Sequence, residues 1–428
     1  MAQSRSAFSA LGPEGRLVSA AVAGFNLLLV VVNRYLPEYL RVLGAQPWII
    51  GLFGSTEIAL ALVYPYLDGE IPDWLDVRHV LTAASILAST GTVVWLAAPR
   101  LGHYTGLPAS AWIFVGLFLV AVWNALGLHL PVGIAPEDDG QSAPDISGAA
   151  VLRWLGLTAG FLFAAFVLAE VGTFVPSLQV LFAVTASLAL TATILQDLFA
   201  HPSKDSTGAT FAGCRRVLDD IRALPAESRS LLVGDTLVRF AHGMVGTFFV
   251  TVVTSVLRVE MMLLGHHFTP SAVFGILLAV EMGVAAVGGG IITVLPRYTG
   301  RVALVLGNVL ITTLFPIFLV TVRTEALAVG VLFAAFGLRR ATLPVRRALI
   351  AEFTAGENDE DDRQLTESYR LSRGAIVVPS AILGGVLYGI NPRLAFVVAT
   401  AVGLLGTWSF TRFIHVIVRD SRSDRTGE

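Results

Sequence analysis

Long runs of apolar residues dominate the chain, and short polar segments separate them. Twelve runs are long enough to cross a bilayer, because about 20 residues at about 1.5 Å per residue span the hydrocarbon core as a helix. They cover residues 17–40, 48–67, 79–98, 109–132, 149–171, 176–200, 230–257, 268–295, 301–322, 325–353, 366–390 and 393–416. Most runs are apolar on all sides, which is typical of helices that contact lipid and other helices. The pattern predicts an all-α integral membrane protein with twelve transmembrane helices.

A long polar gap in the middle of the chain separates the first six runs from the last six. We predict an N-terminal six-helix bundle over residues 1–200, a linker over 201–229 and a C-terminal six-helix bundle over 230–428. Apolar residues within the linker recur at helical spacing beside charged ones, which predicts a short amphipathic helix on the membrane surface. The linker therefore marks the expected boundary between the bundles.

Composition agrees with this pattern, and the charges add an orientation. Apolar residues make up 55% of the 428 residues, charged residues make up 14%, and the mean hydropathy is +0.73, which excludes a soluble fold. Basic residues favour the cytoplasmic side of a membrane. With both termini and the linker on that side, 22 of the 29 Lys and Arg residues are cytoplasmic, five are outside, and Arg34 and Arg239 lie within helices. We predict a multi-pass protein of the cell membrane with both termini in the cytoplasm.

A glycine and a glutamate recur at the same spacing in the second and eighth runs. The second run contains WIIGLFGSTEIALA, with Gly51 six residues before Glu57, and the eighth contains AVFGILLAVEMGVA, with Gly275 six residues before Glu281. Internal repeats of this kind are typical of membrane proteins built from two related halves. The repeat therefore favours two pseudo-symmetric six-helix bundles.

The arrangement of six plus six helices, with a central linker and a degenerate signature after helices 2 and 8, resembles the major facilitator superfamily. The signature usually reads G-x-x-x-D-(R/K)-x-G-(R/K)-(R/K), and the two stretches here read GEIPDWLDVRH and TVLPRYTGRV. The matching positions are Gly69, Asp73, Arg78, Gly300 and Arg301. The segments GLRRATLPVRRALIAE and DTLVRF are similar to helices 10 and 7 of bacterial and archaeal multidrug-type members. The resemblance implies a secondary transporter that carries a small solute by alternating access.

The same resemblance implies a cytoplasmic gate. In the family, the loop aspartate engages the start of helix 11 and latches the outward-facing state, so Asp73 would face Arg370 and Arg373. Arg297 stands where the second signature has its aspartate, and Arg297 and Arg301 would face the acidic stretch before the fifth helix. We hypothesise a compensated exchange of charges between the halves. Ordinary solvated loop charges would explain these residues equally well.

Two acidic residues fall near the middle of predicted helices, where a charge costs about 2.5 to 3.5 kcal/mol on insertion scales. Glu57 and Glu281 would face a central cavity as pseudo-symmetric carboxylates that bind a cationic or polar substrate or exchange a proton. The alternative is structural: Glu57 pairs with Arg34 of the first helix, and Glu281 is hydrogen-bonded to a neighbouring helix. An ion pair could also be part of a gate.

Helix 7 adds a set of polar residues on one face, because Asp235, Arg239 and His242 are spaced by four and three positions. Asp235 and Arg239 are expected to neutralise each other. His242 could take and release protons, or could only form a hydrogen bond. Helices 1 and 4 line the cavity in the resembled family, which implies substrate contacts for Asn33 and Asn124.

Other functional classes find less support in the sequence. There is no phosphate-binding loop for an ATP-driven pump, and the eight histidines form no metal or catalytic motif, so we expect no enzyme activity, cofactor or metal. A transporter-like sensor or scaffold without flux remains the alternative. The expected partners are a small-molecule substrate, the lipid bilayer and protons, with no nucleic acid, and the expected state is a monomer.

Overall fold

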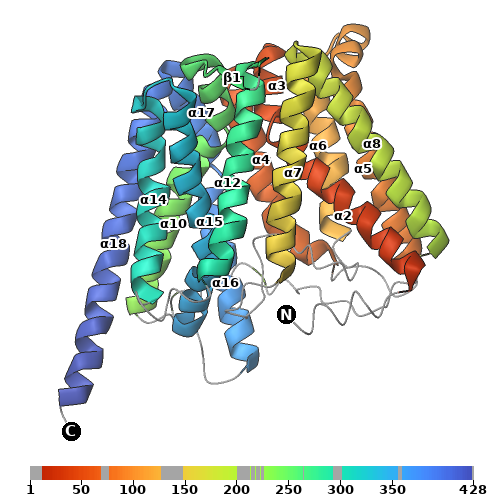
Figure 1. The fold of residues 1–428 in the computed structure, drawn as a ribbon. Coiled ribbons are helices and arrows are strands. Elements are labelled where there is room, and N and C mark those ends of the chain that lie inside the picture. The colour runs from red at the N-terminus through yellow and green to blue at the C-terminus, as the bar shows by residue number, and fades with distance from the viewer. Residues whose placement is uncertain are drawn as a thin grey trace.

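Long helices packed side by side make up the protein (Figure 1). A computed structural model describes residues 12–68, 77–126, 148–199, 213, 217, 222, 226–263, 265–292, 301–354 and 359–426. Within these residues, eleven helices are long and apolar enough to cross a membrane, and a bent pair brings the number to twelve. This confirms the predicted all-α membrane class with twelve spans.

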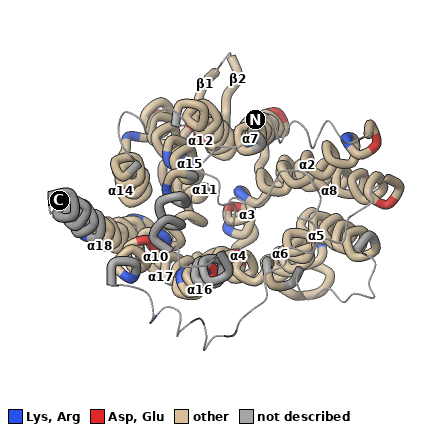
Figure 2. The backbone as a smooth tube through the Cα atoms, turned by 90° about the horizontal axis from the view of Figure 1, so that it is seen from below, with Lys and Arg blue, Asp and Glu red and all other residues tan. Residues whose placement is uncertain are grey.

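The helices before the linker form one group, which we call the N-half, and those after it form the C-half (Figure 2). The N-half consists of α2 (Pro13–Asn33), α3 (Leu36–Val42), α4 (Pro47–Asp68), α5 (Val77–Thr105), α6 (Ala109–Leu126), α7 (Gly148–Val171) and α8 (Phe174–Phe199). The C-half consists of α10 (Ala226–Gly246), α11 (Phe249–Thr251), the π-helix η2 (Val252–Leu257), α12 (Pro270–Ile292), α14 (Arg301–Thr321), α15 (Ala326–Thr354), α16 (Asp359–Val377), α17 (Ser380–Ile390) and α18 (Pro392–Thr426). The predicted amphipathic helix lies largely outside the described residues, and α10 already begins within the predicted linker.

The start of α2 and the end of α18 lie on one side of the bundle, which we call the terminal side (Figure 1). The opposite side carries α3 and a two-stranded antiparallel hairpin, β1 (Met261–Leu263) and β2 (His266–Phe268). We call it the hairpin side. The sequence had placed Phe268 at the start of the eighth helix, but that helix begins at Pro270. His266 of β2 lies 3.9 Å from Glu170 at the end of α7, so the hairpin touches the other half.

Two predicted helices are interrupted at matching points of the halves. The first breaks between α2 and α3, and the seventh bends by 48° between α10 and α11. At these breaks the Tyr35 amide donates to the Val32 carbonyl at 3.0 Å, and the Phe248 amide donates to the Val245 carbonyl at 2.9 Å. Such i to i−3 bonds turn the chain while keeping backbone groups satisfied at membrane depth. The breaks therefore point side chains of the first and seventh helices into the space between the halves.

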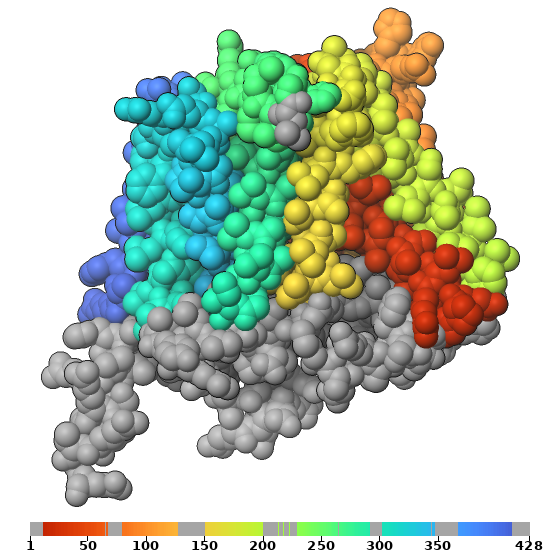
Figure 3. Space-filling view, viewed as in Figure 1, coloured from red at the N-terminus to blue at the C-terminus, as the bar shows by residue number. Residues whose placement is uncertain are grey.

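The halves meet where α4 packs on α17 and α7 packs on α12, and the α7–α12 seam is visible in Figure 3. The two repeated glycines lie in these contacts. Gly51 faces the Ala381 carbonyl oxygen so closely that a Cβ would collide with it, and a Cβ at Gly275 would lie 3.1 Å from the Phe161 carbonyl oxygen. The repeat thus marks two places where backbones of opposite halves approach closely, as small residues allow in membranes.

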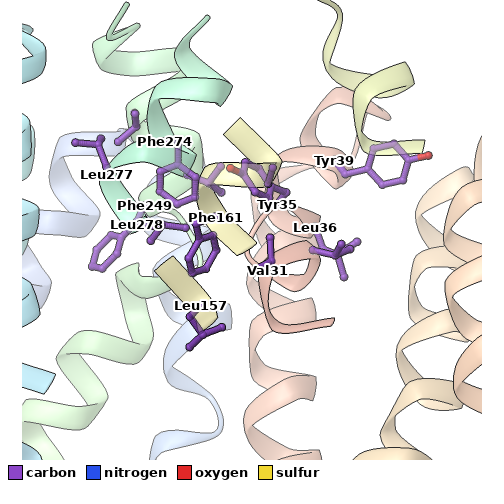
Figure 4. Close-up of a cluster of buried hydrophobic side chains, with 14 of the residues drawn as sticks. Val31, Tyr35, Leu36, Tyr39, Leu157, Phe161, Phe249, Phe274, Leu277 and Leu278 are labelled. Atoms are coloured by element: carbon purple, nitrogen blue, oxygen red, sulfur yellow. The ribbon is translucent and has the colours of Figure 1, made fainter. Parts of the chain in front are cut away.

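Apolar side chains of both halves join in one buried cluster between α3, α7, α11 and α12 (Figure 4). Tyr35 of the N-half and Phe274 of the C-half meet edge to face, with ring centroids 5.7 Å apart and an interplanar angle of 86°. Phe161 and Phe249 belong to the same cluster. This packing closes the hairpin side of the interface.

Candidate functional site: a charged cavity between the halves

A cavity of about 90 Å³ lies between the two halves. The break after α2 and helix α4 line it from the N-half, and α10, α11, α12 and α15 line it from the C-half. Its polar lining is Asn33, Arg34, Glu57, His242, Thr247, Glu281 and Arg340, and its aromatic lining is Phe249, Phe274 and Phe336. Five residues of the predicted substrate site, from four different helices, are therefore brought together here.

The cavity is closed towards the hairpin side. Residues 35–40 and 248–253, which follow the two breaks, are all buried. Towards the terminal side, Arg239 and His242 are partly exposed and Arg34 is exposed. The cavity is smaller than sites for drug-sized ligands, which occupy about 300 to 1,000 Å³. The halves must therefore move for a larger solute to enter.

Glu57 is held from the N-half side of the cavity. Asn33, the last residue of α2, donates a hydrogen bond from Nδ2 to Glu57 Oε1. Arg34, in the break itself, lies close enough for its charge to act on Glu57. Both the predicted charge partner and a polar neighbour thus surround this carboxylate, which reduces the cost of placing it in a membrane.

Glu281 is held from the C-half side by a residue that the sequence analysis did not assign to the site. Arg340 of α15 donates from Nε to Glu281 Oε1 at 2.5 Å, and both side chains are more than nine-tenths buried. Two charges buried together lose their hydration, and their attraction offsets that loss only in a close, hydrogen-bonded pair. The neighbouring helix that contacts Glu281 therefore supplies a cation.

His242 lies among aromatic rings at the C-half side of the cavity. Its ring centroid is 5.7 Å from that of Phe249 and 5.8 Å from that of Phe336. Its Nδ1 has no hydrogen-bond partner among the described residues. The charges of Arg34 and Arg340 both act on His242, so the histidine belongs to the same electrostatic site as the two carboxylates.

Asp235 lies closer to the terminal side, at the centre of a larger ion cluster than the predicted pair. Asp235 is fully buried, and Arg239 Nε lies 3.5 Å from its Oδ2. Arg373 of α16 donates from Nη1 to the same oxygen at 3.1 Å, and Arg346 of α15 donates to Oδ1. Arg346 also donates to Asn308 Oδ1 at 3.3 Å. The cluster joins α10, α15 and α16, and Asn308 links it to α14.

Asn124 of α6 is hydrogen-bonded to Tyr64 of α4 and is not among the described residues that line the cavity. Arg373 contacts Asp235 of its own half. The other predicted gate residues are seen incompletely. Four of them lie outside the described residues: Gly69, Asp73, Arg297 and Gly300. Arg78 and Arg301 lie in the first turns of α5 and α14, but their side chains are not described. Arg370 lies on α16. The latch stays a prediction.

Solved structures with the same arrangement of helices are transporters. The nucleoside transporter NupG superposes with a TM-score of 0.66 at 13% identity, over 94% of this chain and 99% of that chain. A POT family transporter in complex with 5-aminolevulinic acid gives a TM-score of 0.65 at 12% identity, over 94% and 96%. The human organic anion transporter MFSD10 gives 0.53 at 15% identity, over 93% and 100%.

No protein-family model matches the sequence, and no curated protein matches it. At identities this low the superpositions establish the fold. They extend over nearly all of each chain, so the likeness concerns the whole two-half architecture and not a single bundle. The chain therefore has the fold of the major facilitator transporters, as the sequence signatures predicted.

Proposed function

We propose that the protein is a secondary active transporter that moves a small solute by alternating access around the cavity between its halves. The observation that carries this proposal is the cavity itself, which both halves line with charged side chains at the breaks of two membrane helices. Transporters with repeated halves bind their cargo near the midplane, where broken helices supply polar groups. Solved neighbours of this fold are named as nucleoside and proton-dependent oligopeptide transporters, which supports the same function.

We assign this conformation to the inward-facing state. The distribution of arginines supports a cell-membrane protein whose terminal side faces the cytoplasm, and the cavity is closed towards the hairpin side. The two moving units would be residues 1–200 and 230–428, joined by the linker 201–229. Opening would require the contacts of α4 with α17 and of α7 with α12 to separate on the hairpin side.

Protons are the proposed coupling ion, and Glu57 and Glu281 are the proposed carriers. A proton on Glu281 would remove the charge that holds Arg340, and a proton on Glu57 would change its contacts with Asn33 and Arg34. Either step changes the charge inside a site of low dielectric, where electrostatic effects are large. The proposed contacts with the solute are then Asn33, Arg34 and His242, and Asn124 is a more distant candidate.

Flux measurements on the full chain in lipid vesicles test this function. A pH-sensitive dye inside the vesicles would record proton movement as nucleosides, dipeptides and small carboxylic acids are added under an imposed pH gradient. We expect at least one class to move protons, and Glu57→Gln and Glu281→Gln to alter that movement. Glu260→Gln, on the exposed hairpin side, is the matched control.

Two results would count against the proposal. If uptake and its pH dependence were the same in wild type and both glutamate variants, the cavity would not be the coupling site. If no class of solute moved at all, a sensor or scaffold without flux would be the better description.

A further inference from the structure

Among the described residues, those that line the cavity or contact Asp235 carry more positive than negative charge. Arg239, Arg346 and Arg373 all contact the single carboxylate of Asp235 among the described residues. Counting these groups together with the cavity lining, the described residues include five arginines and three carboxylates. Within this described set the arginines therefore outnumber the carboxylates.

Helix α15 carries this positive charge from the cluster to the cavity. Arg346 and Arg339 are seven residues apart and so lie on the same face, two turns apart. Arg339 stacks over the ring of Phe336, 4.2 Å from its centroid, and Phe336 lines the cavity beside Arg340. A solute that enters from the terminal side would meet guanidinium groups in sequence before it reached Glu57.

The cluster also keeps hydrogen-bonding capacity for a further acceptor. Arg346 Nε and the Tyr369 hydroxyl are buried and have no hydrogen-bond partner among the described residues. Tyr369 adjoins the cluster, since the guanidinium of Arg373 lies 5.8 Å from its ring centroid. Buried donors of this kind are normally satisfied, by protein, water or a ligand.

We propose that the transported solute is a small organic anion with a carboxylate or phosphate group on an apolar, compact body. This inference rests on the proposed transport function. Arginine forks match the two oxygens of a carboxylate or phosphate, and Phe249, Phe274 and Phe336 provide an apolar wall for the body. Positive potential along the entry route attracts anions and repels cations of the same shape.

A matched set of ligands tests the charge preference directly. Benzoate, benzamide and benzylamine share a ring and carry negative, zero and positive charge. The unfolding temperature of the purified full chain would be followed in a neutral detergent with each of them. Benzoate is expected to stabilise the protein at a concentration at least tenfold lower than the other two. No stabilisation by benzoate, or equal stabilisation by benzylamine, would overturn the proposal.

Variants test whether Arg340 of the cavity is responsible for binding benzoate. The double change Arg340→Gln with Glu281→Gln removes both charges of a pair and leaves no buried charge alone, so it is expected to fold. It should weaken benzoate binding by tenfold or more. Arg323→Gln, on the exposed turn before α15, should leave it unchanged. Equal affinity in the double variant and in wild type would contradict binding at Arg340.

Two further comparisons are needed. One distinguishes a lipid headgroup from a solute as the bound anion, and the other distinguishes anion binding from transport. If anionic phosphatidylglycerol alone gave the stabilisation and displaced benzoate, the arginines would bind lipid headgroups, and the solute proposal would be wrong. Benzoate binding without benzoate flux in vesicles would leave the anion site standing and refute transport. Flux of benzylamine but not benzoate would support transport and refute the anion class.

Discussion

Arg340 compensates a carboxylate that lies inside the membrane-spanning part of α12. Glu281 was predicted as a site residue because a charge at that depth needs a partner or a purpose. Its partner could not be predicted, because α15 offers several arginines near its terminal-side end and only their orientation selects one. Arg340 and Arg346 turn towards different acids, Glu281 and Asp235 respectively. A buried acid in one helix and adjacent arginines in another are the signal that could have suggested the pair.

Removing one member of this pair should destabilise the protein much more than removing both. Arg340→Gln leaves Glu281 buried without its cation, which is expected to cost about 3 to 5 kcal/mol. The double change Arg340→Gln with Glu281→Gln should recover most of that loss, because glutamine pairs with glutamine without a charge. Chemical unfolding in detergent would measure both. Equal losses in the single and double variants would mean that the pair is not coupled.

Tyr35 and Tyr39 provide a second test at this scale, because both are fully buried in the hairpin-side packing. The Tyr39 hydroxyl donates to the Trp95 carbonyl at 3.3 Å, whereas the Tyr35 hydroxyl has no hydrogen-bond partner among the described residues. Tyr35→Phe should therefore leave the free energy of unfolding unchanged or raise it by about 1 kcal/mol, and Tyr39→Phe should lower it by about 1 kcal/mol. The opposite order would show that Tyr35 has a partner in solution.

At the scale of helices, hydropathy predicted the existence of each span but not its interruptions. The predicted first, seventh and eleventh helices are continuous in the sequence pattern, yet each is divided in the structure. A break of two or three residues hardly changes the apolar content of a run, so a pattern of hydrophobicity does not record it. Pro379 explains the break before α17, because proline has no backbone N–H to donate. Pro37, in the first turn of α3, marks the break at Arg34 in the same way, whereas the break at Thr247 has no such signal.

The repeated glycines predict how the hairpin side closes. Gly51 sits against the Ala381 carbonyl, and a leucine there would force α4 and α17 apart. Gly51→Leu should therefore favour the conformation that is open on the hairpin side. Gly307→Leu on α14 is the control, since a Cβ at Gly307 meets nothing within 4 Å. Distances between spin labels at the hairpin-side ends of α4 and α17 should lengthen in the first variant and not in the second. Unchanged distances in Gly51→Leu would refute this role for the contact.

At the scale of the whole molecule, the two-half architecture followed from features that do not depend on side-chain geometry: the number of apolar runs, the central polar gap and the repeat. Which residues line the cavity depends, in contrast, on side-chain geometry as well. Arg34, Glu57, His242 and Glu281 were predicted from their depth in helices and Asn33 from the family resemblance, and the structure gathers all five at one place. The Asp235 cluster was only partly predicted, because its arginines come from helices far apart in the sequence. No amount of local pattern specifies such a contact.

Alternating access makes one central demand: the same cavity residue must be reachable from either side, depending on conformation. Thr247 lies at the break after α10 and lines the cavity, and Cys214 is the single natural cysteine. A Thr247→Cys variant in a Cys214→Ser background can therefore be labelled in vesicles of known orientation with a membrane-impermeant thiol reagent. We predict labelling from the terminal side, and a shift to the hairpin side when Gly51→Leu is added. Labelling from one and the same side in both proteins would contradict alternating access around this cavity.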